Sequence, residues 1–209
     1  MFITLEGPEG GGKTTQAQLL VSWLLQRGYD VLAVREPGGT EISDAVRHIL
    51  LDFVSANLDA RAELLLFCAS RAQLVSEKIA PHLVHGGIVV CDRFADSTLA
   101  YQGFGRGLDL DLLRSLLAFA TYNLRPDLTL LLDVDVDTGL QRKVSDAEWN
   151  RLDAEAIEFH RRVRAGYHTL ASDEPERWRV INAQLPASVV TGKIQQVVRQ
   201  ALENQKISL

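Results

Sequence analysis

Short apolar segments alternate with longer segments of helical periodicity along this chain. Five of the short segments are continuous apolar runs, which is typical of strands covered on both faces of a sheet. They are Phe2–Leu5, Val31–Val34, Ile88–Cys91, Leu128–Leu132 and Trp178–Ile181. Between them, apolar residues recur at the spacing of a helix face over Thr14–Gln26, Asp59–His85, Asp109–Tyr122, Arg151–Leu170 and Ser188–Leu202.

The alternation of strands and helices predicts an α/β fold with a mostly parallel sheet between helical layers. The longest helix is expected to bend near Pro81, because proline has no N–H to donate to the carbonyl of Glu77. No repeat, low-complexity tract or linker divides the 209 residues, so we expect a single domain over 1–209. Ligands of such folds bind at the carboxyl ends of the strands.

Composition and charge exclude several classes of protein. Hydrophobic residues make up 46% of the chain and charged residues 23%, which excludes a disordered or collagen-like protein. The formal net charge of −5 argues against a broad nucleic-acid-binding surface, so we expect no nucleic-acid partner. The sequence contains neither a signal-peptide pattern nor an apolar run near the ~18 residues of a membrane span. With only two cysteines, Cys68 and Cys91, we expect a cytoplasmic protein without membrane contact.

A glycine-rich segment follows the first predicted strand and opens the first predicted helix. It reads Gly7-Pro8-Glu9-Gly10-Gly11-Gly12-Lys13-Thr14 and matches GxxxxGK[ST], the phosphate-binding loop or P-loop. In this motif backbone N–H groups point at phosphate oxygens, the lysine contacts the β- and γ-phosphates, and the threonine hydroxyl can bind Mg²⁺. These residues and Thr15 therefore predict a nucleoside triphosphate site in which Lys13 is catalytic.

A P-loop alone does not distinguish a GTPase, a motor and a small-molecule kinase. The guanine-reading NKxD motif of GTPases is absent from the sequence. Asp92-Arg93 follows the third predicted strand, where it could be a solvated turn. Opposite a P-loop, however, Asp92 can hold Mg²⁺ directly or through water, and the planar guanidinium of Arg93 can clamp a second phosphate group. We therefore favour a kinase in which both residues are catalytic.

Two other segments carry candidate site residues. The second predicted strand is followed by the segment Arg35-Glu36-Pro37-Gly38-Gly39-Thr40. This segment could be a tight turn in which Thr40 is a helix N-cap, or it could be part of the site. Phe67 and Arg71 are four residues apart and share a face of the long helix. They could be a core phenylalanine beside a partly exposed arginine. Alternatively, a nucleobase could stack on Phe67 while Arg71 donates a hydrogen bond to its carbonyl edge.

These segments together resemble the bacterial thymidylate kinase family over nearly the whole chain. The matching segments are FITLEGPEGGGKTT, REPGGT, AELLLFCASRAQ, CDRFADSTLAYQGFGRGL, RPDLTLLLDV and RAGY. The resemblance implies a P-loop NTPase three-layer sandwich, with a five-stranded parallel sheet and a short lid at about residues 141–152. It also implies transfer of the γ-phosphoryl of ATP to dTMP with Mg²⁺, a step of dTTP biosynthesis, in a homodimer.

The resemblance also assigns residues to the acceptor and to the lid. Phe67 would stack on thymine, Arg71 would bond the base edge, and Arg93 would hold the 5′-phosphate. In the lid, Arg142 and Arg151 match catalytic arginines, and Arg142 also belongs to the ATP site. The full set implied for dTMP is Glu9, Glu36, Pro37, Phe67, Arg71, Arg93, Thr98, Tyr101 and Gln102, with Thr14 and Asp92 for the metal.

The lid departs from the family pattern. Asp146 stands where an arginine is usual, and Asn150 replaces the usual aspartate before Arg151. The lid therefore carries less positive charge than expected. The leading hypothesis is an active dTMP kinase; a kinase with an altered acceptor, such as dUMP or a thymidine analogue, and a nucleotide-binding protein with little turnover are the alternatives.

Overall fold

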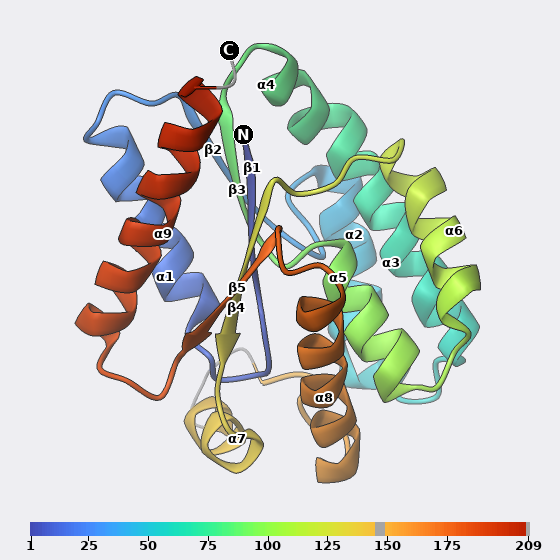
Figure 1. The fold of residues 1–209 in the computed structure, drawn as a ribbon. Coiled ribbons are helices and arrows are strands. Elements are labelled where there is room, and N and C mark those ends of the chain that lie inside the picture. Colours follow the sequence, from blue (N-terminus) through green and yellow to red (C-terminus); the bar gives the residue numbers. More distant parts are fainter. Residues whose placement is uncertain (145–148, 208–209) are drawn as a thin grey trace.

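The computed structural model describes residues 1–144 and 149–207, and a five-stranded sheet lies at its centre (Figure 1). All of the paired strands are parallel, in the order β2-β3-β1-β4-β5. The predicted α/β fold with a five-stranded parallel sheet is confirmed. The strands are β1 (Phe2–Glu6), β2 (Val31–Arg35), β3 (Ile88–Asp92), β4 (Leu128–Asp133) and β5 (Trp178–Asn182).

Each strand ends one residue later than the apolar pattern predicts, and each additional residue is polar. The ladder continues through these residues, since Asp92 pairs with both Leu5 and Arg35. Backbone hydrogen bonding in a sheet does not require an apolar side chain, so the pattern of buried residues ends before the strand does. The carboxyl edge therefore carries a row of polar side chains: Glu6, Arg35, Asp92, Asp133 and Asn182.

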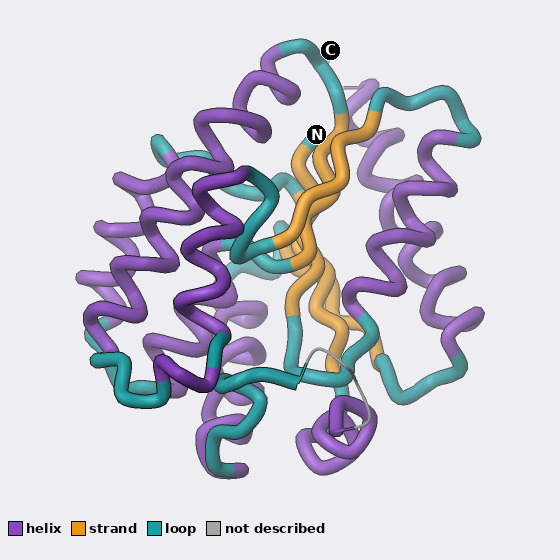
Figure 2. The backbone as a smooth tube through the Cα atoms, turned by 180° about the vertical axis from the view of Figure 1, so that it is seen from behind, coloured by secondary structure: helices purple, strands orange, loops and turns teal. Residues whose placement is uncertain are grey.

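Helices cover both faces of the sheet, which gives the predicted three layers (Figures 1 and 2). On one face, α1 (Lys13–Leu25) and α9 (Ala187–Ile207) pack on each other and enclose one hydrophobic core. On the other face, α3 (Ala60–Leu74), α6 (Leu110–Thr121) and α8 (Ile157–Asp173) enclose a second core. The central strands β1 and β3 are buried throughout and β4 is buried up to its last residue, Asp133, whereas the edge strands β2 and β5 are partly exposed.

The long helix predicted over Asp59–His85 is observed as α3, a π-helical turn (Val75–Ile79) and α4 (Ala80–Val84). The side chain of Asp59 caps its N-terminus by accepting a hydrogen bond from the Arg61 backbone N–H at 2.9 Å. The π-helical turn ends two residues before Pro81, whose missing N–H leaves the helix without one of its bonds. The departure from α geometry thus lies where the sequence predicts an irregularity.

In the described part of the chain, three helical segments escape the apolar pattern besides a single 3₁₀ turn at Phe53–Ser55. They are α2 (Glu41–Leu51), α5 (Ala95–Thr98) with its π-helical continuation (Leu99–Gly105), and α7 (Val136–Val144). Thr40 is the N-cap of α2, as one interpretation of its segment predicts, and its hydroxyl accepts a hydrogen bond from Ser43 N at 3.1 Å. Conversely, the helix predicted from Arg151 begins only at α8, because residues 151–155 form turns.

Two further features concern the cysteines and possible membrane spans. Cys68 and Cys91 are free, buried thiols. No helix in the described part of the chain is long and apolar enough to cross a membrane. The cytoplasmic location stays a prediction.

Candidate active site

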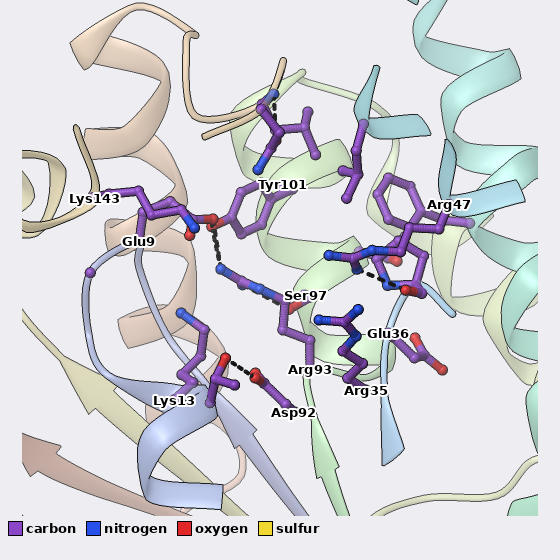
Figure 3. Close-up of a pocket in the computed structure, with 18 of the residues that line it drawn as sticks. Glu9, Lys13, Arg35, Glu36, Arg47, Asp92, Arg93, Ser97, Tyr101 and Lys143 are labelled. Atoms are coloured by element: carbon purple, nitrogen blue, oxygen red, sulfur yellow. Dashed lines mark hydrogen bonds and ion pairs between the residues drawn. The ribbon is translucent and has the colours of Figure 1, made fainter. Parts of the chain in front are cut away.

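A cavity of about 320 Å³ opens at the carboxyl edge of the sheet, between the P-loop, the end of β3 and helix α3 (Figure 3). Four of the predicted site residues, Gly7, Pro8, Gly11 and Arg151, do not line it. The other predicted residues do: Glu9, Gly10, Gly12, Lys13, Thr14, Thr15, Glu36, Pro37, Phe67, Arg71, Asp92, Arg93, Thr98, Tyr101, Gln102 and Arg142.

Lys13 lies at the first turn of α1, and its ammonium group turns back onto the P-loop. Its Nζ donates hydrogen bonds to the carbonyl oxygens of Gly7 at 3.1 Å and Pro8 at 2.7 Å. Burial, with a further contribution from the charge of Arg93, lowers the pKa of Lys13 to about 8. The loop thus places a buried cation, hydrogen-bonded to its backbone carbonyls, in the wall of the cavity.

Thr14 and Asp92 bring two oxygen donors together beside Lys13. The Thr14 hydroxyl donates a hydrogen bond of 2.6 Å to Asp92 Oδ2 (Figure 3). Mg²⁺ prefers oxygen ligands and usually keeps several waters or phosphate oxygens in its shell. A hydroxyl and a carboxylate in contact at a P-loop therefore fit the predicted metal ligands.

Arg93 follows β3 with a positive φ of 70°, which is uncommon for any residue other than glycine. Its guanidinium reaches back over the P-loop, where Nη1 donates to the Gly7 carbonyl and Nη2 to Glu9 Oε1, at 3.2 and 2.6 Å. The Tyr101 hydroxyl accepts from Nη2 at 3.1 Å and donates to the same Glu9 oxygen at 2.6 Å. Backbone strain held in place by such contacts is a frequent feature of functional sites.

Glu9 is the acidic group of this cluster. Burial raises the pKa of Glu9, but the charges of Arg93 and Lys13 outweigh burial and lower it to about 2. The carboxylate is therefore ionised at neutral pH. It offers a fixed acceptor beside the arginine that would hold a phosphate.

A second buried carboxylate, Glu6 at the end of β1, lies beneath Arg93. It accepts hydrogen bonds from Phe94 N at 2.8 Å, Ser97 Oγ at 2.6 Å and Tyr167 OH at 3.1 Å. Burial and the nearby charge of Asp96 raise the pKa of Glu6 to about 7. Ser97 and Tyr167 also contact Arg93 Nη1 at 3.2 Å, so Glu6 orients the two hydroxyls that orient the arginine.

Phe67 and Arg71 both lie on the cavity side of α3, as their spacing predicts. The burial is the reverse of the core interpretation, because Phe67 is partly exposed while Arg71 is 1% exposed. Arg71 forms a buried ion pair with Glu36 at 2.5 Å and donates to Thr98 Oγ1 at 3.0 Å. Burial raises the pKa of Glu36 despite this ion pair. An aromatic face and a rigidly held guanidinium thus lie together at this end of the cavity.

Arg151, which the resemblance matches to a catalytic arginine of the lid, does not line the cavity. Its side chain is buried against Glu63, with Nη2 donating to Glu63 Oε2 at 2.6 Å and to the Leu50 carbonyl at 3.0 Å. Since Arg151 does not line the cavity, the geometry does not support a catalytic contact for this residue. It joins the segment before α8 to α2 and α3.

Arg142 lies on α7 beside the P-loop and lines the cavity. The two segments approach closely at glycines, because a Cβ on Gly10 would lie 2.0 Å from the Gly139 carbonyl oxygen. Arg142 Nη1 contacts the carbonyl oxygens of Ala183 at 3.1 Å and Gly10 at 3.4 Å. Of the lid residues that depart from the family pattern, Asp146 lies outside the described residues. Asn150 is described and donates to Asp153 Oδ2 through its backbone N–H at 2.9 Å.

The cavity includes residues that the sequence interpretation did not assign. Arg35 is in register with Asp92 at the carboxyl edge, so the row of strand-end residues could have identified it. Arg47 and Leu51 come from α2, which the prediction missed. The remaining unassigned lining residues are Ser97, Lys143, Asn150 and Leu152.

The fold and the site define a P-loop kinase for a small phosphorylated acceptor. The cavity is lined by the P-loop with Lys13 and the Thr14–Asp92 pair, and by Phe67 and Arg71 of α3. Arg93 also lines it and contacts the P-loop at Gly7 and Glu9. This arrangement gives two anion sites within one cavity, as transfer of a phosphoryl group between two phosphates requires.

Comparison with known proteins identifies the family. The thymidylate kinase family model matches residues 5–194. The chain is 50% identical to the thymidylate kinase of Roseiflexus castenholzii over 95% of this chain and 92% of that protein. It is also 50% identical to that of Thermomicrobium roseum, over 99% and 98%. The crystal structure of the Ehrlichia chaffeensis thymidylate kinase superposes with a TM-score of 0.78 at 38% identity, covering 95% and 98% of the two chains. The chain belongs to the thymidylate kinase family, whose members phosphorylate dTMP.

Proposed function

We propose that this chain phosphorylates dTMP to dTDP with ATP and Mg²⁺, a step of dTTP biosynthesis, in the cavity at the carboxyl edge of the sheet. The observation that carries the proposal is the position of Arg93 between the P-loop carboxylate of Glu9 and Tyr101. ATP would bind on the P-loop side, with Lys13, Thr14, Thr15 and Arg142. dTMP would bind on the α3 side, with Phe67, Arg71, Thr98, Gln102, Glu36 and Pro37.

The chemistry requires positioning more than a dedicated base. A phosphate monoester loses its second proton near pH ~6, so an oxygen of dTMP is already a nucleophile at neutral pH. Arg93 would hold this phosphate in line with ATP, and Lys13 would stabilise the charge that develops on the β- and γ-phosphates. Arg35, in register with Asp92, offers a second cation for the acceptor side. Glu9 would accept a hydrogen bond from the deoxyribose 3′-hydroxyl.

Thr14 and Asp92 would hold the magnesium ion. In the described part of the chain, no cluster of three or more His, Cys, Asp or Glu residues could hold a metal. The remaining ligands would therefore be phosphate oxygens and water, as is usual for Mg²⁺ bound with a nucleotide. When bound, the ion neutralises charge on the β- and γ-phosphates.

A coupled ADP-release assay with dTMP, dUMP, dCMP, dGMP and thymidine tests the function. We expect the highest kcat/KM with dTMP, and no turnover with thymidine, which has no phosphate for Arg93. A higher kcat/KM with another monophosphate would contradict the acceptor assignment. Binding of ATP and dTMP without ADP release would favour the nucleotide-binding protein with little turnover.

Substitution of Phe67 by alanine is expected to raise the KM for dTMP ~10- to 100-fold, because one stacking contact is worth about 1–3 kcal/mol. The KM for ATP should change little, since Phe67 lies at the α3 end of the cavity. Steady-state kinetics with each substrate varied in turn measure both constants. The melting temperature is the control for a packing defect, and an equal rise in both constants would indicate that Phe67 only supports the fold.

Substitution of Arg142 by alanine is expected to lower kcat at least ~10-fold with little change in the KM for dTMP, because a lid arginine would contact the transferring phosphoryl group. Arg151→Ala provides the contrast, since this buried arginine pairs with Glu63 and its loss should mainly lower the melting temperature. If Arg142→Ala keeps full kcat at saturating ATP, the charge expected from the lid must come from elsewhere. Lys143, which also lines the cavity, would be the next candidate.

The homodimer implied by the family is also a proposal, and exposed apolar side chains support it. Helices α2, α3 and α6 pack side by side on one flank of the molecule (Figure 1). Their outer faces expose Ile49, Leu65, Leu112 and Phe119, the last at 85%. Exposed apolar side chains on neighbouring helices can form protein–protein contacts, so we propose this flank as the place where a second copy would pack.

A further inference from the structure

Gln102 carries the one amide among the side chains assigned to the acceptor, and an amide can turn either its oxygen or its nitrogen to a ligand. Its Nε2 donates a hydrogen bond of 2.8 Å to Oε1 of Glu63, a residue of α3 that does not itself line the cavity. An ionised carboxylate only accepts hydrogen bonds, so the N–H group of Gln102 must face Glu63. Its Oε1 then makes no hydrogen bond within the described residues, and Gln102 lines the cavity.

Glu63 is fixed as an ionised, fully buried acceptor. Burial raises its pKa, but hydrogen bonds from Arg106 and Gln102, together with Arg151, outweigh burial and hold the pKa below its usual value. Arg106 donates through Nε at 3.2 Å and Nη2 at 3.1 Å, and Arg151 through Nη2 at 2.6 Å. The two guanidinium groups require oxygen atoms from residue 63, so neither oxygen of the carboxylate can be exchanged for a donor without cost.

Arg71 presents the complementary hydrogen-bonding group. Its Nε and Nη2 donate to Glu36, Nη2 also donates to the Phe94 carbonyl, and Nη1 donates to Thr98. A guanidinium has five N–H groups. Among the described residues, one N–H group on Nη1 therefore has no acceptor, and it can bond to a ligand. The cavity wall thus offers a donor from Arg71 and an acceptor from Gln102.

We propose that Glu63 is a positioning residue for base specificity, which holds the Gln102 amide with its oxygen toward the base. The inference rests on the proposed acceptor site. Thymine offers an accepting O4 and a donating N3–H, which match Arg71 and Gln102 Oε1. Cytosine offers a donating amino group and an accepting N3, so donor would face donor and acceptor would face acceptor. Leaving buried polar groups unpaired in this way is the strongest source of discrimination available to a binding site.

The substitution Glu63→Gln tests this assignment. The new amide must direct its oxygen to Nη2 of Arg106 and Nη2 of Arg151, and its NH₂ group then faces both Gln102 and Arg106 Nε. A guanidinium has no acceptor, so Gln102 is the neighbour that can adapt to this NH₂ group. Gln102 is expected to turn over and present its own NH₂ group to the base. The ratio of kcat/KM for dTMP to that for dCMP should therefore fall at least ~10-fold, with a matching change in the ratio of dissociation constants. A fall of both values by the same factor would overturn the proposal, because it would show a structural role alone.

Arg106→Lys is the matched control, since Arg106 donates hydrogen bonds to both oxygens of Glu63 but, among the described residues, forms none with Gln102. It should lower the melting temperature and leave the dTMP-to-dCMP ratio unchanged. If Glu63→Gln fails to fold, Glu63→Asp decides. This variant keeps the charge opposite the arginines but withdraws the carboxylate from Gln102, so its ratio should also fall. An unchanged ratio in folded Glu63→Asp would overturn the proposal.

Gln102→Met separates this inference from the proposed acceptor site. The substitution alone should lower the dTMP-to-dCMP ratio, and Glu63→Gln added to it should change the ratio no further. If Gln102→Met leaves the ratio unchanged, the base does not lie at Gln102 and the acceptor site itself is wrong. If Gln102→Met lowers the ratio but Glu63→Gln does not, the acceptor site stands and the role of Glu63 is refuted.

Discussion

Replacing Lys13 with alanine is expected to reduce kcat at least ~10²-fold while the protein stays folded, because the substitution removes a preorganised charge from the developing transition state. Lys13 Nζ donates hydrogen bonds to the carbonyl oxygens of Gly7 and Pro8 and lines the cavity. These carbonyl groups cannot themselves stabilise a phosphate, because their oxygens carry partial negative charge and the phosphate is an anion. With Lys13 absent, the P-loop would contribute only its N–H groups and the helix N-terminus.

Single-turnover measurements at saturating ATP and dTMP report the Lys13 effect without the complication of weaker binding. Lys78→Ala is the matched control, because Lys78 is exposed on the π-helical turn and does not line the cavity. It should leave kcat unchanged, and both variants should melt near the wild-type temperature. Near-wild-type turnover of Lys13→Ala would mean that the P-loop is not the donor site.

The residues that the sequence identifies best are those tied to the end of a strand. Lys13, Asp92 and Arg93 follow continuous apolar runs, and in a parallel sheet the carboxyl ends of such runs lie at one edge. Their proximity therefore follows from the topology alone. The same argument could have included Arg35, whose strand end pairs with Asp92.

The residues whose surroundings the sequence does not indicate depend on partners far along the chain. Arg151 is matched to the lid by the resemblance, yet its carboxylate partner Glu63 lies 88 residues earlier. No local pattern indicates that pairing, and the turns at residues 151–155 that bury Arg151 delay the start of α8. Glu6 is equally hidden, because its partners Ser97 and Tyr167 lie 91 and 161 residues away.

Burial is the second property that spacing cannot supply. Their spacing places Phe67 and Arg71 on the same face of a helix whether or not either side chain is buried. The spacing therefore leaves open which of the two is buried. The buried ion pair with Glu36, 35 residues earlier, allows Arg71 to be covered while Phe67 remains accessible. A charged group is buried only where a partner compensates its desolvation, and that partner comes from tertiary structure.

Replacing Arg93 with alanine is expected to lower kcat/KM for dTMP ~10³-fold or more, the largest effect in the acceptor site. The arginine would hold the 5′-phosphate through a charge-assisted, planar contact, and arginines at transferring phosphoryl groups contribute ~10³–10⁵ in rate. Its loss also leaves Glu9 with one cation fewer, so the Glu9 carboxylate would repel the incoming phosphate. Arg93→Lys keeps the charge without the planar fork, so its kcat/KM should lie between the values of the wild type and Arg93→Ala.

Binding of thymidine distinguishes a phosphate contact from a general defect at Arg93. Thymidine shares the base and sugar of dTMP but has no 5′-phosphate, so Arg93→Ala should weaken binding of dTMP at least ~10-fold and leave the affinity for thymidine nearly unchanged. Calorimetric titrations with both ligands measure the two affinities. Because Arg93 also contacts Gly7, Ser97 and Tyr167, the melting temperature of the variant must be followed in parallel. An equal loss of affinity for both ligands in a folded variant would show that Arg93 supports the shape of the cavity and does not bind the phosphate.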